Sequence, residues 1–266
     1  MIWLNGALLD EAGPHLHASD RGFAHGDGVF ETLRSTRGVA WHAARHFARL
    51  RDGAALLGIP VLHTDAELSA AISQCTQADE AAVRITLSRG PGPRGLQTHA
   101  VPSPTLLITA GPLPSVPEGG FAIIASGTRR NEFSPLASIK SLNYLDSILA
   151  RREAVAAGAD EAILCNTAGN LAEACAGNLF LRVGEQWFTP PVADGALPGV
   201  ARGIILEAGL AQERGLTRHD ALGATHAFVS SALALRPLDR INSHHLEPTH
   251  LQDVRRALQD ERATAR

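Results

Sequence analysis

The segment Ser134-Pro135-Leu136-Ala137-Ser138-Ile139-Lys140-Ser141-Leu142-Asn143-Tyr144-Leu145 contains the only lysine of this 266-residue chain, in which every other cationic side chain is an arginine. Arginine replaces lysine in most surface roles, but it keeps its proton and cannot attack a carbonyl group. A chain that retains a single side-chain amine therefore indicates covalent chemistry at Lys140. Codon bias that left one stray surface lysine is the alternative on composition alone.

Apolar residues recur at helical spacing after this lysine: Leu142, Leu145, Ile148, Leu149 and Ala156. This spacing predicts a helix over 141–157 that ends at Gly158. Lys140 would then precede a helix N-terminus, where the dipole and the apolar neighbours both disfavour a charged ammonium group. A neutral amine is what a Schiff-base lysine needs. A solvated lysine at a helix start is the alternative.

The composition excludes several classes of protein. Hydrophobic residues make up 45% and charged residues 19%, so a sizeable core can form and disorder is not expected. A net charge of −3 argues against nucleic-acid binding. The sequence has no run of 18 apolar residues, so no membrane helix is predicted. The first residues lack the basic region of a signal peptide. Three cysteines without a CxxC pair predict neither a disulfide framework nor a zinc ribbon, and we expect a cytoplasmic protein.

The segment Gly111–Gly120 is the best candidate for a linker, because its three prolines and three glycines cannot continue a regular element. We expect a smaller α/β domain over 1–113, a linker over 114–120 and a larger domain over 121–266. The predicted strands are 2–4, 7–9, 28–34, 82–88, 105–110, 121–125, 161–165, 171–173, 178–183 and 226–229. Further helices are predicted at 41–57, at 199–209 and from 249 onward. This mixture predicts an α+β chain.

Two later segments contain residues suited to binding charged groups. Glu173 lies among small and apolar residues, where a carboxylate needs a cationic partner such as a protonated pyridine nitrogen or an arginine. Within Leu197–Ile204 a glycine turn opens a helix and offers backbone N–H groups to a phosphate. Ser230 and Ser231 follow a predicted strand and could add hydroxyl groups. Ordinary turns are the alternative for both the helix start and the serines.

Two further groups of polar residues allow both a functional and a structural interpretation. Arg94 lies in the Gly- and Pro-rich segment Arg89–Gly95 and could hold a substrate carboxylate, although a solvated surface loop is equally compatible. His15, His17 and His25 lie near acidic residues, but their spacing favours turn histidines over metal ligands. We therefore expect no metal site.

Four motifs together resemble the class IV aminotransferases, which are the fold-type IV pyridoxal-phosphate (PLP) enzymes. These are Asp20–Thr32, the Lys140 segment, the Glu173 segment and Leu197–Arg202, in the order and spacing of that family. The family includes D-amino-acid and branched-chain aminotransferases and 4-amino-4-deoxychorismate lyase. The resemblance implies a larger C-terminal domain that is β-barrel-like, PLP as cofactor, small-molecule amino substrates and a homodimer. No nucleic-acid or membrane partner is expected.

The resemblance also implies roles for individual residues. Lys140 would form the internal aldimine with PLP and then move the proton at the substrate Cα, while Glu173 would pair with the pyridinium nitrogen. The implied phosphate-binding residues are Arg49, the backbone amides of Val200 and Ala201, Ser231 and its neighbour Ser230. Tyr144 would approach the cofactor, and Phe30 and Arg94 would contact the substrate. Ala201 lacks the hydroxyl group that the family often has at this position, so only its N–H can serve.

The motifs do not agree on the reaction. The short chain, the Arg89–Gly95 segment and the Glu173 segment resemble the lyase, which expels pyruvate to leave 4-aminobenzoate in the folate pathway. The segment Lys140–Leu145 resembles aminotransferases, because the lyase usually has a histidine after the lysine. Leu96 replaces a histidine that is typical of D-amino-acid aminotransferases. The lyase is the leading prediction, and a D-amino-acid or branched-chain transaminase that uses 2-oxoglutarate or pyruvate is the alternative.

Overall fold

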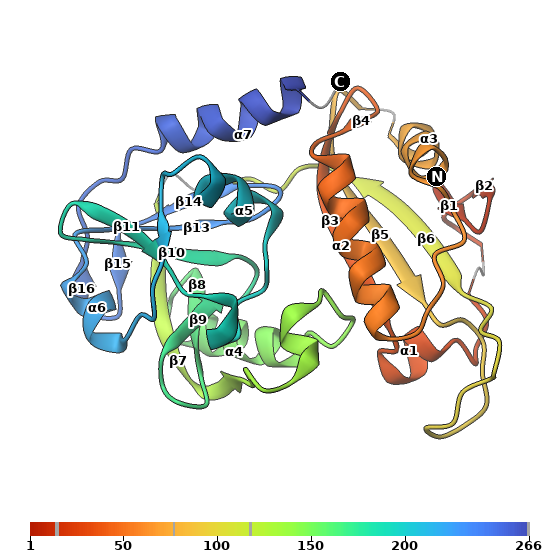
Figure 1. Ribbon diagram of the computed structural model, residues 1–266, viewed down its shortest axis with the longest axis horizontal. Helices are drawn as coiled ribbons and strands as arrows, with labels where there is room; N and C mark the ends of the chain where they lie inside the picture. The colour runs from red at the N-terminus through yellow and green to blue at the C-terminus, as the bar shows by residue number, and fades with distance from the viewer. Residues whose placement is uncertain (14–15, 77, 117–118, 265–266) are drawn as a thin grey trace. The chain divides into compact units, whose positions relative to one another are not determined.

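A computed structural model describes residues 1–13, 16–76, 78–116 and 119–264 of the chain (Figure 1). The chain forms two compact units: unit 1 comprises Met1–Pro114 and Ile139–Asn143, and unit 2 comprises Ser115–Ser138 and Tyr144–Arg266. Helices and strands occur in both units, which confirms the predicted α+β class. The expected linker includes Pro117 and Glu118, which lie outside the described residues, so the domain limits stay a prediction.

Unit 1 is built on a six-stranded antiparallel sheet in the order β2-β1-β6-β5-β3-β4. Its elements are β1 (Ile2–Leu4), β2 (Ala7–Leu9), α1 (Arg21–His25), β3 (Gly28–Thr36), β4 (Val39–Ala40), α2 (Ala43–Leu56), α3 (Asp65–Cys75), β5 (Glu80–Ser88) and β6 (Thr105–Gly111). Asn5 and Gly6 both have positive φ, 47° and 98°, as a tight two-residue hairpin turn requires. The predicted hairpin of 2–4 with 7–9 is thereby confirmed.

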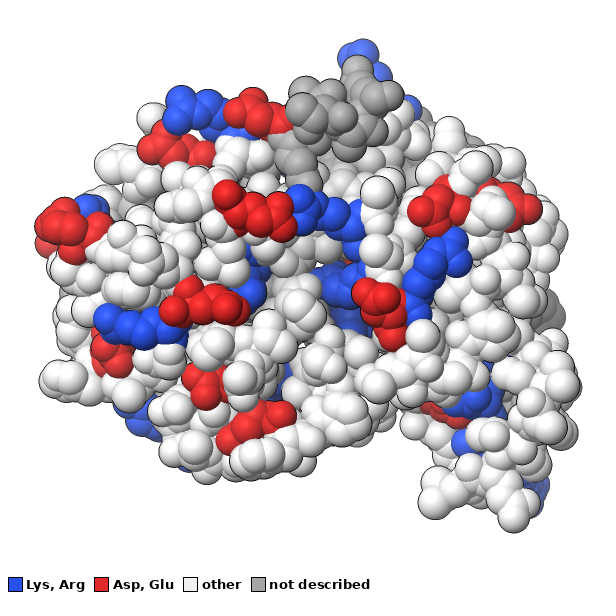
Figure 2. All heavy atoms as spheres, in the orientation of Figure 1, with Lys and Arg blue, Asp and Glu red and all other residues white. Residues whose placement is uncertain are grey.

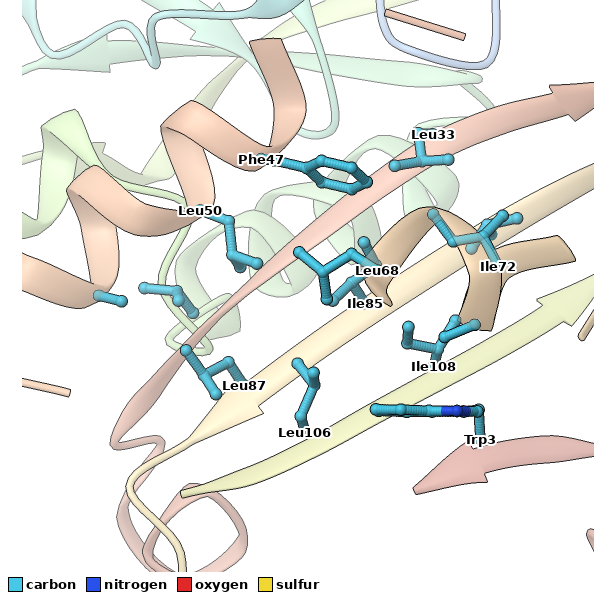
Figure 3. Packing of buried hydrophobic residues seen from close by; sticks show 14 of the residues in the cluster. Trp3, Leu33, Phe47, Leu50, Leu68, Ile72, Ile85, Leu87, Leu106 and Ile108 are labelled. Carbon is cyan, nitrogen blue, oxygen red and sulfur yellow. The ribbon is translucent and has the colours of Figure 1, made fainter. Parts of the chain in front are cut away.

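The core of unit 1 lies between this sheet and the helices α2 and α3 (Figure 3). Phe47 and Leu50 come from α2, and Leu68 and Ile72 from α3, each at most 1% exposed. Alternate residues of β3, β5 and β6 meet them, since every second side chain of a strand points to the same face. The helix predicted over 41–57 is therefore present as α2 and packs on the sheet through its apolar face.

Unit 2 contains two five-stranded sheets of mixed direction, β12-β11-β10-β13-β14 and β16-β15-β7-β8-β9. Its strands are β7 (Phe121–Arg130), β8 (Glu161–Asn166), β9 (Leu171–Ala174), β10 (Asn178–Val183), β11 (Gln186–Thr189), β12 (Gln212–Glu213), β13 (His226–Ser230), β14 (Leu235–Leu238), β15 (Arg240–Ile241) and β16 (His244–His245). Its helices are α4 (Leu145–Ala156), α5 (Val200–Glu207), α6 (Arg218–Gly223) and α7 (Gln252–Thr264), with 3-10 turns at Pro135–Ser138 and Val192–Asp194. Helix α4 packs on β7 and β8, and α5 packs on α7.

The helix predicted over 141–157 begins four residues later than expected, at Leu145. Residues 139–143 instead extend along β3, where Val29 and Ser141 form an antiparallel bridge. Backbone groups that bond to a strand cannot also form the first turn of a helix. Helical spacing of apolar side chains does not reveal this competition.

On the face shown in Figure 2, acidic and basic side chains are interspersed rather than gathered into one basic field. Across the described ranges, no helix has the length and apolarity to cross a membrane.

Candidate functional site

Lys140 is held on β3 by its own backbone. The N–H of Phe30 donates to the carbonyl of Lys140 at 2.9 Å, and the N–H of Leu142 donates to the carbonyl of Gly28 at 2.9 Å. Two main-chain bonds on either side of one residue fix its Cα position and the direction of its side chain. Lys140 as a whole residue is half-buried.

The aromatic ring of Phe30 carries two cationic groups. The Nζ of Lys140 lies 4.5 Å from the ring centroid, and the guanidinium carbon of Arg84 lies 3.8 Å from the same centroid. Phe30 itself is 6% exposed and therefore rigid. Arg84 was missed in the sequence, although it is a lone charge in the apolar strand over 82–88. The structure thus places a second cation, suited to a carboxylate, against the same ring as the amine.

Arg49 lies in a buried cluster on helix α2. Its Nε and Nη2 each donate to Glu31 at 2.7 Å, in the two-bond geometry typical of arginine and carboxylate. The Nδ1 of His46 lies 2.7 Å from the same carboxylate. The side chain of Glu31 is completely buried and that of Arg49 is 13% exposed. Glu31 therefore fixes the guanidinium of the arginine that the family resemblance assigns to phosphate binding.

The ionisation of Glu31 depends on this cluster. Burial by itself would raise the pKa of Glu31, but hydrogen bonds from Arg49 and His46 outweigh burial and hold the pKa below its ordinary value of 4.5. The carboxylate therefore stays charged at neutral pH although it is inside the protein.

Glu173 lies in unit 2 on β9 and is 8% exposed. Its Oε2 accepts the N–H of Leu197 at 2.9 Å, and its Oε1 lies 3.1 Å from the Nε of Arg130. The arginine partner that the sequence left open as an alternative is thus present.

The start of helix α5 is shaped by close backbone packing. Gly199 is the N-cap of α5 and has no side-chain cap. A Cβ at residue 199 would overlap Oδ1 of Asn178, whose Nδ2 donates to the carbonyl of Leu197 at 2.8 Å. The chain therefore needs glycine here, and the first N–H groups of the helix, at Val200 and Ala201, are left for a ligand or solvent.

Ser230 and Ser231 differ in their environments. Ser230 stands opposite Asn178 in the pairing of β10 with β13, and its Oγ is buried without a hydrogen-bond partner in the described part of the chain. The Oγ of Ser231 accepts the N–H of Ala234 at 3.1 Å in a local turn. The hydroxyl of Ser231 therefore belongs to an ordinary turn, as the alternative predicted. The buried hydroxyl of Ser230 has no hydrogen-bond partner among the described residues, although buried hydroxyl groups usually have one.

The loop that carries Arg94 is anchored by Arg21. The Nη1 of Arg21 lies 2.9–3.3 Å from the carbonyl oxygens of Pro93, Gly95 and Gln97, and its Nε donates to Asp27 at 2.9 Å. Arg94 itself is exposed, as the solvated-loop alternative predicted. Arg21 was missed as a positioning residue, although it lies in the Asp20–Thr32 motif.

Two remaining predictions concern Tyr144 and metal binding. Tyr144 is the N-cap of α4 and is half-buried. In the described ranges no three His, Cys, Asp or Glu side chains are grouped to hold a metal ion. His15 lies outside those ranges, and the Nδ1 of His17 lies 2.8 Å from the Oγ of Ser19 within its own turn.

Comparison with known proteins agrees with these motifs. The sequence model of "Amino-transferase class IV" matches residues 28–241. A protein of Methanocaldococcus jannaschii that carries the provisional name of a branched-chain-amino-acid aminotransferase is 31% identical over 97% of this chain and 94% of its own length. D-alanine aminotransferase of Bacillus licheniformis is 30% identical over 88% of this chain and 85% of its own length. The structure of 4-amino-4-deoxychorismate lyase from Pseudomonas aeruginosa is similar with a TM-score of 0.83 and 29% sequence identity. The match covers 98% of this chain and 97% of the lyase chain. The resemblance and the fold type inferred from the motifs are confirmed.

Replacing Glu31 by glutamine is expected to lower the free energy of unfolding by about 3–5 kcal/mol, because Arg49 loses its buried counter-charge. Asp65→Asn is the matched control, since it breaks an exposed pair with Arg51 and is expected to cost less than about 1 kcal/mol. Urea unfolding measures both. Equal costs would contradict the importance of the buried cluster.

The cost of Glu31→Gln is also expected to depend on pH. The pKa of Glu31 is lowered in the folded chain, so its contribution is complete above pH 4.5 and declines as the pH falls through the lowered value. Urea unfolding at a series of acidic pH values would show the difference between the two proteins shrinking. A difference that grows on acidification would contradict this sign.

Proposed function

Since this chain belongs to the class IV aminotransferases, which are PLP-dependent enzymes, we propose that Lys140 is its catalytic base and its covalent PLP-binding residue. The observation that carries the proposal is the placement of the only side-chain amine. It lies on the Phe30 ring between two main-chain hydrogen bonds, with the Arg84 guanidinium on the same ring. No other side chain of the sequence can form a Schiff base.

Three features of unit 2 are suited to binding PLP. Ser230 has a buried hydroxyl without a partner, which a phosphate oxygen would satisfy. Gly199 leaves the N-terminus of α5 open, where the N–H groups of Val200 and Ala201 suit an anion. Glu173 presents a carboxylate fixed by Leu197, which suits a protonated ring nitrogen. We further propose that Arg49 binds the phosphate, that Ser231 is a second phosphate contact next to Ser230 and that Tyr144 contacts the ring.

PLP, when bound, withdraws electrons from the bonds at the substrate Cα. Lys140 would remove the proton from the substrate Cα and then pass it to a second atom. This is general acid–base chemistry carried out by one amine. Arg84 would bind a substrate carboxylate, because a guanidinium recognises carboxylates through two parallel hydrogen bonds. Phe30 would keep both groups in place, and Arg94, on the loop anchored by Arg21, would meet the outer part of the substrate.

For the reaction we propose 4-amino-4-deoxychorismate lyase activity, in which pyruvate is eliminated to leave 4-aminobenzoate. It is supported by the lyase-like loop over 89–95, whose carbonyls are gathered around Arg21, and by the similarity to the Pseudomonas aeruginosa lyase over nearly the full length of both chains. Loss of pyruvate creates an aromatic ring, which drives the elimination. The reaction needs no amino acceptor as a second substrate.

Transamination is the second candidate, because a specific observation favours it. The segment Lys140-Ser141-Leu142-Asn143-Tyr144-Leu145 is of the aminotransferase type, and the Methanocaldococcus jannaschii relative with an aminotransferase name covers 97% of this chain. The donor would be a branched-chain or D-amino acid, and 2-oxoglutarate or pyruvate the acceptor. We also propose that the enzyme is a cytoplasmic homodimer, as the family resemblance implies.

A substrate panel separates the two reactions. Purified holoenzyme is given aminodeoxychorismate in one arm, and L-leucine or D-alanine with 2-oxoglutarate in the other. The proposal predicts 4-aminobenzoate and pyruvate without an amino acceptor. Keto-acid formation from an amino donor, with no 4-aminobenzoate, would replace the lyase by the transaminase. Lys140→Ala is the control in both arms and is expected to lose turnover and the borohydride-reducible PLP adduct.

Replacing Glu173 by glutamine is expected to leave PLP bound but to slow turnover by about a hundredfold or more, because a neutral amide cannot stabilise a protonated ring nitrogen. The exposed Glu185→Gln is the matched control and is expected to have no effect. Single-turnover kinetics and the absorbance of the holoenzyme measure both. An unchanged rate would overturn the role of Glu173.

Replacing Gly199 by alanine is expected to weaken PLP binding about tenfold or more, because the new Cβ would overlap Asn178 and displace the start of α5. Gly223→Ala in α6 is the matched control, since a Cβ there meets no atom within 4 Å. Titration of each apoprotein with PLP, followed by absorbance, measures the affinity. Equal affinities would show that the α5 turn does not bind the cofactor.

A further inference from the structure

Arg130, at the end of β7, contacts three segments of unit 2 that are separate in sequence. Its Nη2 donates to the carbonyl of Ala137 in the first 3-10 turn, and its Nε donates to the carbonyl of Gly195, each at 3.1 Å. The same Nε lies 3.1 Å from Oε1 of Glu173. A guanidinium holds its donors in one rigid plane, so a single arginine can join several segments in a fixed arrangement.

Each of these segments leads to a group that we have assigned to the cofactor. Glu173 is the proposed partner of the ring nitrogen. Gly195 lies two residues before Leu197, whose N–H donates to Oε2 of Glu173 at 2.9 Å. Ala137 lies three residues before Lys140 in sequence. A change in the position of the guanidinium would therefore affect several cofactor-binding segments at once.

Strand pairing determines the distance between Arg130 and Glu173. Strand β8 lies between β7 and β9 in the sheet (Figure 1). Arg130 pairs with Asn166 of β8, and Glu173 pairs with Leu164 of the same strand. Residues two apart on a strand point to the same face, so the two charged side chains meet on one face of the sheet. Both are largely buried, with 18% of the arginine and 11% of the glutamate side chain exposed.

Gly195 makes the third contact possible. Its φ is 92°, and a Cβ at this residue would lie only 3.2 Å from the Cβ of Arg130. Glycine is suited to both the positive φ and the close approach. The main chain can therefore come near enough for the carbonyl of Gly195 to accept the Nε of Arg130.

The charge of Arg130 acts on a specific equilibrium. A proton between a carboxylate and a pyridine nitrogen can lie on either group. An opposite charge close to a carboxylate favours its ionised form, and the effect is stronger for buried groups. Because the guanidinium lies against Glu173, it favours the arrangement in which the carboxylate is charged and the nitrogen carries the proton.

We propose that Arg130 is the positioning residue for Glu173: its charge keeps the proton on the ring nitrogen of PLP rather than on the carboxylate, and its contacts hold that carboxylate in place. The inference rests on the proposed pairing of Glu173 with the ring nitrogen. It does not depend on whether the enzyme is a lyase or a transaminase, because a protonated ring accepts electrons in either reaction.

Nitrogen NMR of the full-length holoenzyme locates this proton. The apoprotein is loaded with PLP that is isotopically labelled at the ring nitrogen, whose chemical shift distinguishes the protonated from the unprotonated form. Wild type is expected to give the protonated signal at neutral pH. Arg130→Met is expected to move the signal toward the unprotonated form, whereas Arg130→Lys keeps the charge and is expected to stay closer to wild type.

Arg218→Met is the matched control. Arg218 also holds a main-chain carbonyl of unit 2, that of Ala125 at 3.3 Å, but has no carboxylate partner among the described residues. This variant is expected to leave the nitrogen signal and turnover unchanged. Arg130→Gln repeats the test with a smaller neutral side chain if circular dichroism shows that the methionine variant does not fold.

A double-mutant cycle shows whether Arg130 acts through Glu173. Turnover is measured with whichever substrate of the panel the wild type converts. Arg130→Met is expected to slow turnover about tenfold or more in the wild-type background, but less than about twofold when Glu173 is already glutamine. A purely structural role of Arg130 would give equal effects in both backgrounds and would contradict the proposal.

The NMR outcomes separate this inference from the proposed function on which it rests. Loss of the protonated signal in both Arg130→Met and Glu173→Gln supports the inference. A protonated signal in Arg130→Met, with loss in Glu173→Gln, would overturn the role of Arg130 and leave that of Glu173 intact. A protonated signal in Glu173→Gln, or an unprotonated one in wild type, would overturn the proposed pairing itself and this inference with it.

Discussion

Two main-chain hydrogen bonds, Phe30 N–H to Lys140 C=O and Leu142 N–H to Gly28 C=O, determine where the amine of this protein lies. They attach residues Ile139–Asn143, which lie in sequence between the two segments of unit 2, to the sheet of unit 1. The same pairing delays the start of α4 to Leu145. Because the backbone bonds fix the position of Lys140 on β3, its side chain extends from a defined point toward the ring of Phe30.

The charged residues around the candidate site are organised by buried carboxylates that each hold arginine. Glu31 fixes Arg49, Asp27 bridges Arg21 and Arg89, and Glu173 lies against Arg130. In each case the planar guanidinium offers several donors in a fixed geometry, which lysine cannot do. The arginine-rich composition therefore has a structural use at these three carboxylates.

Much of the fold could be predicted because short-range rules apply to it. The Asn5-Gly6 turn requires positive φ, and the apolar spacing on α2 matches the face that is buried. Helix α3 was missed, although Thr64 and Glu67 form a capping box that can be read in the sequence. Helix α4 shows the limit of such rules, since spacing identifies a helix but not whether its apolar side faces the sheet.

The sequence by itself determined the family, because the motifs around Asp20–Thr32, Lys140, Glu173 and Leu197–Arg202 occur in the order and spacing of class IV aminotransferases. Only the tertiary structure decided which groups surround them. Arg84 reaches the Phe30 ring from β5, Glu31 holds Arg49 from β3, and Arg130 reaches Glu173 from β7. These contacts join residues far apart in the chain, and their distances follow from strand pairing and helix packing rather than from local sequence.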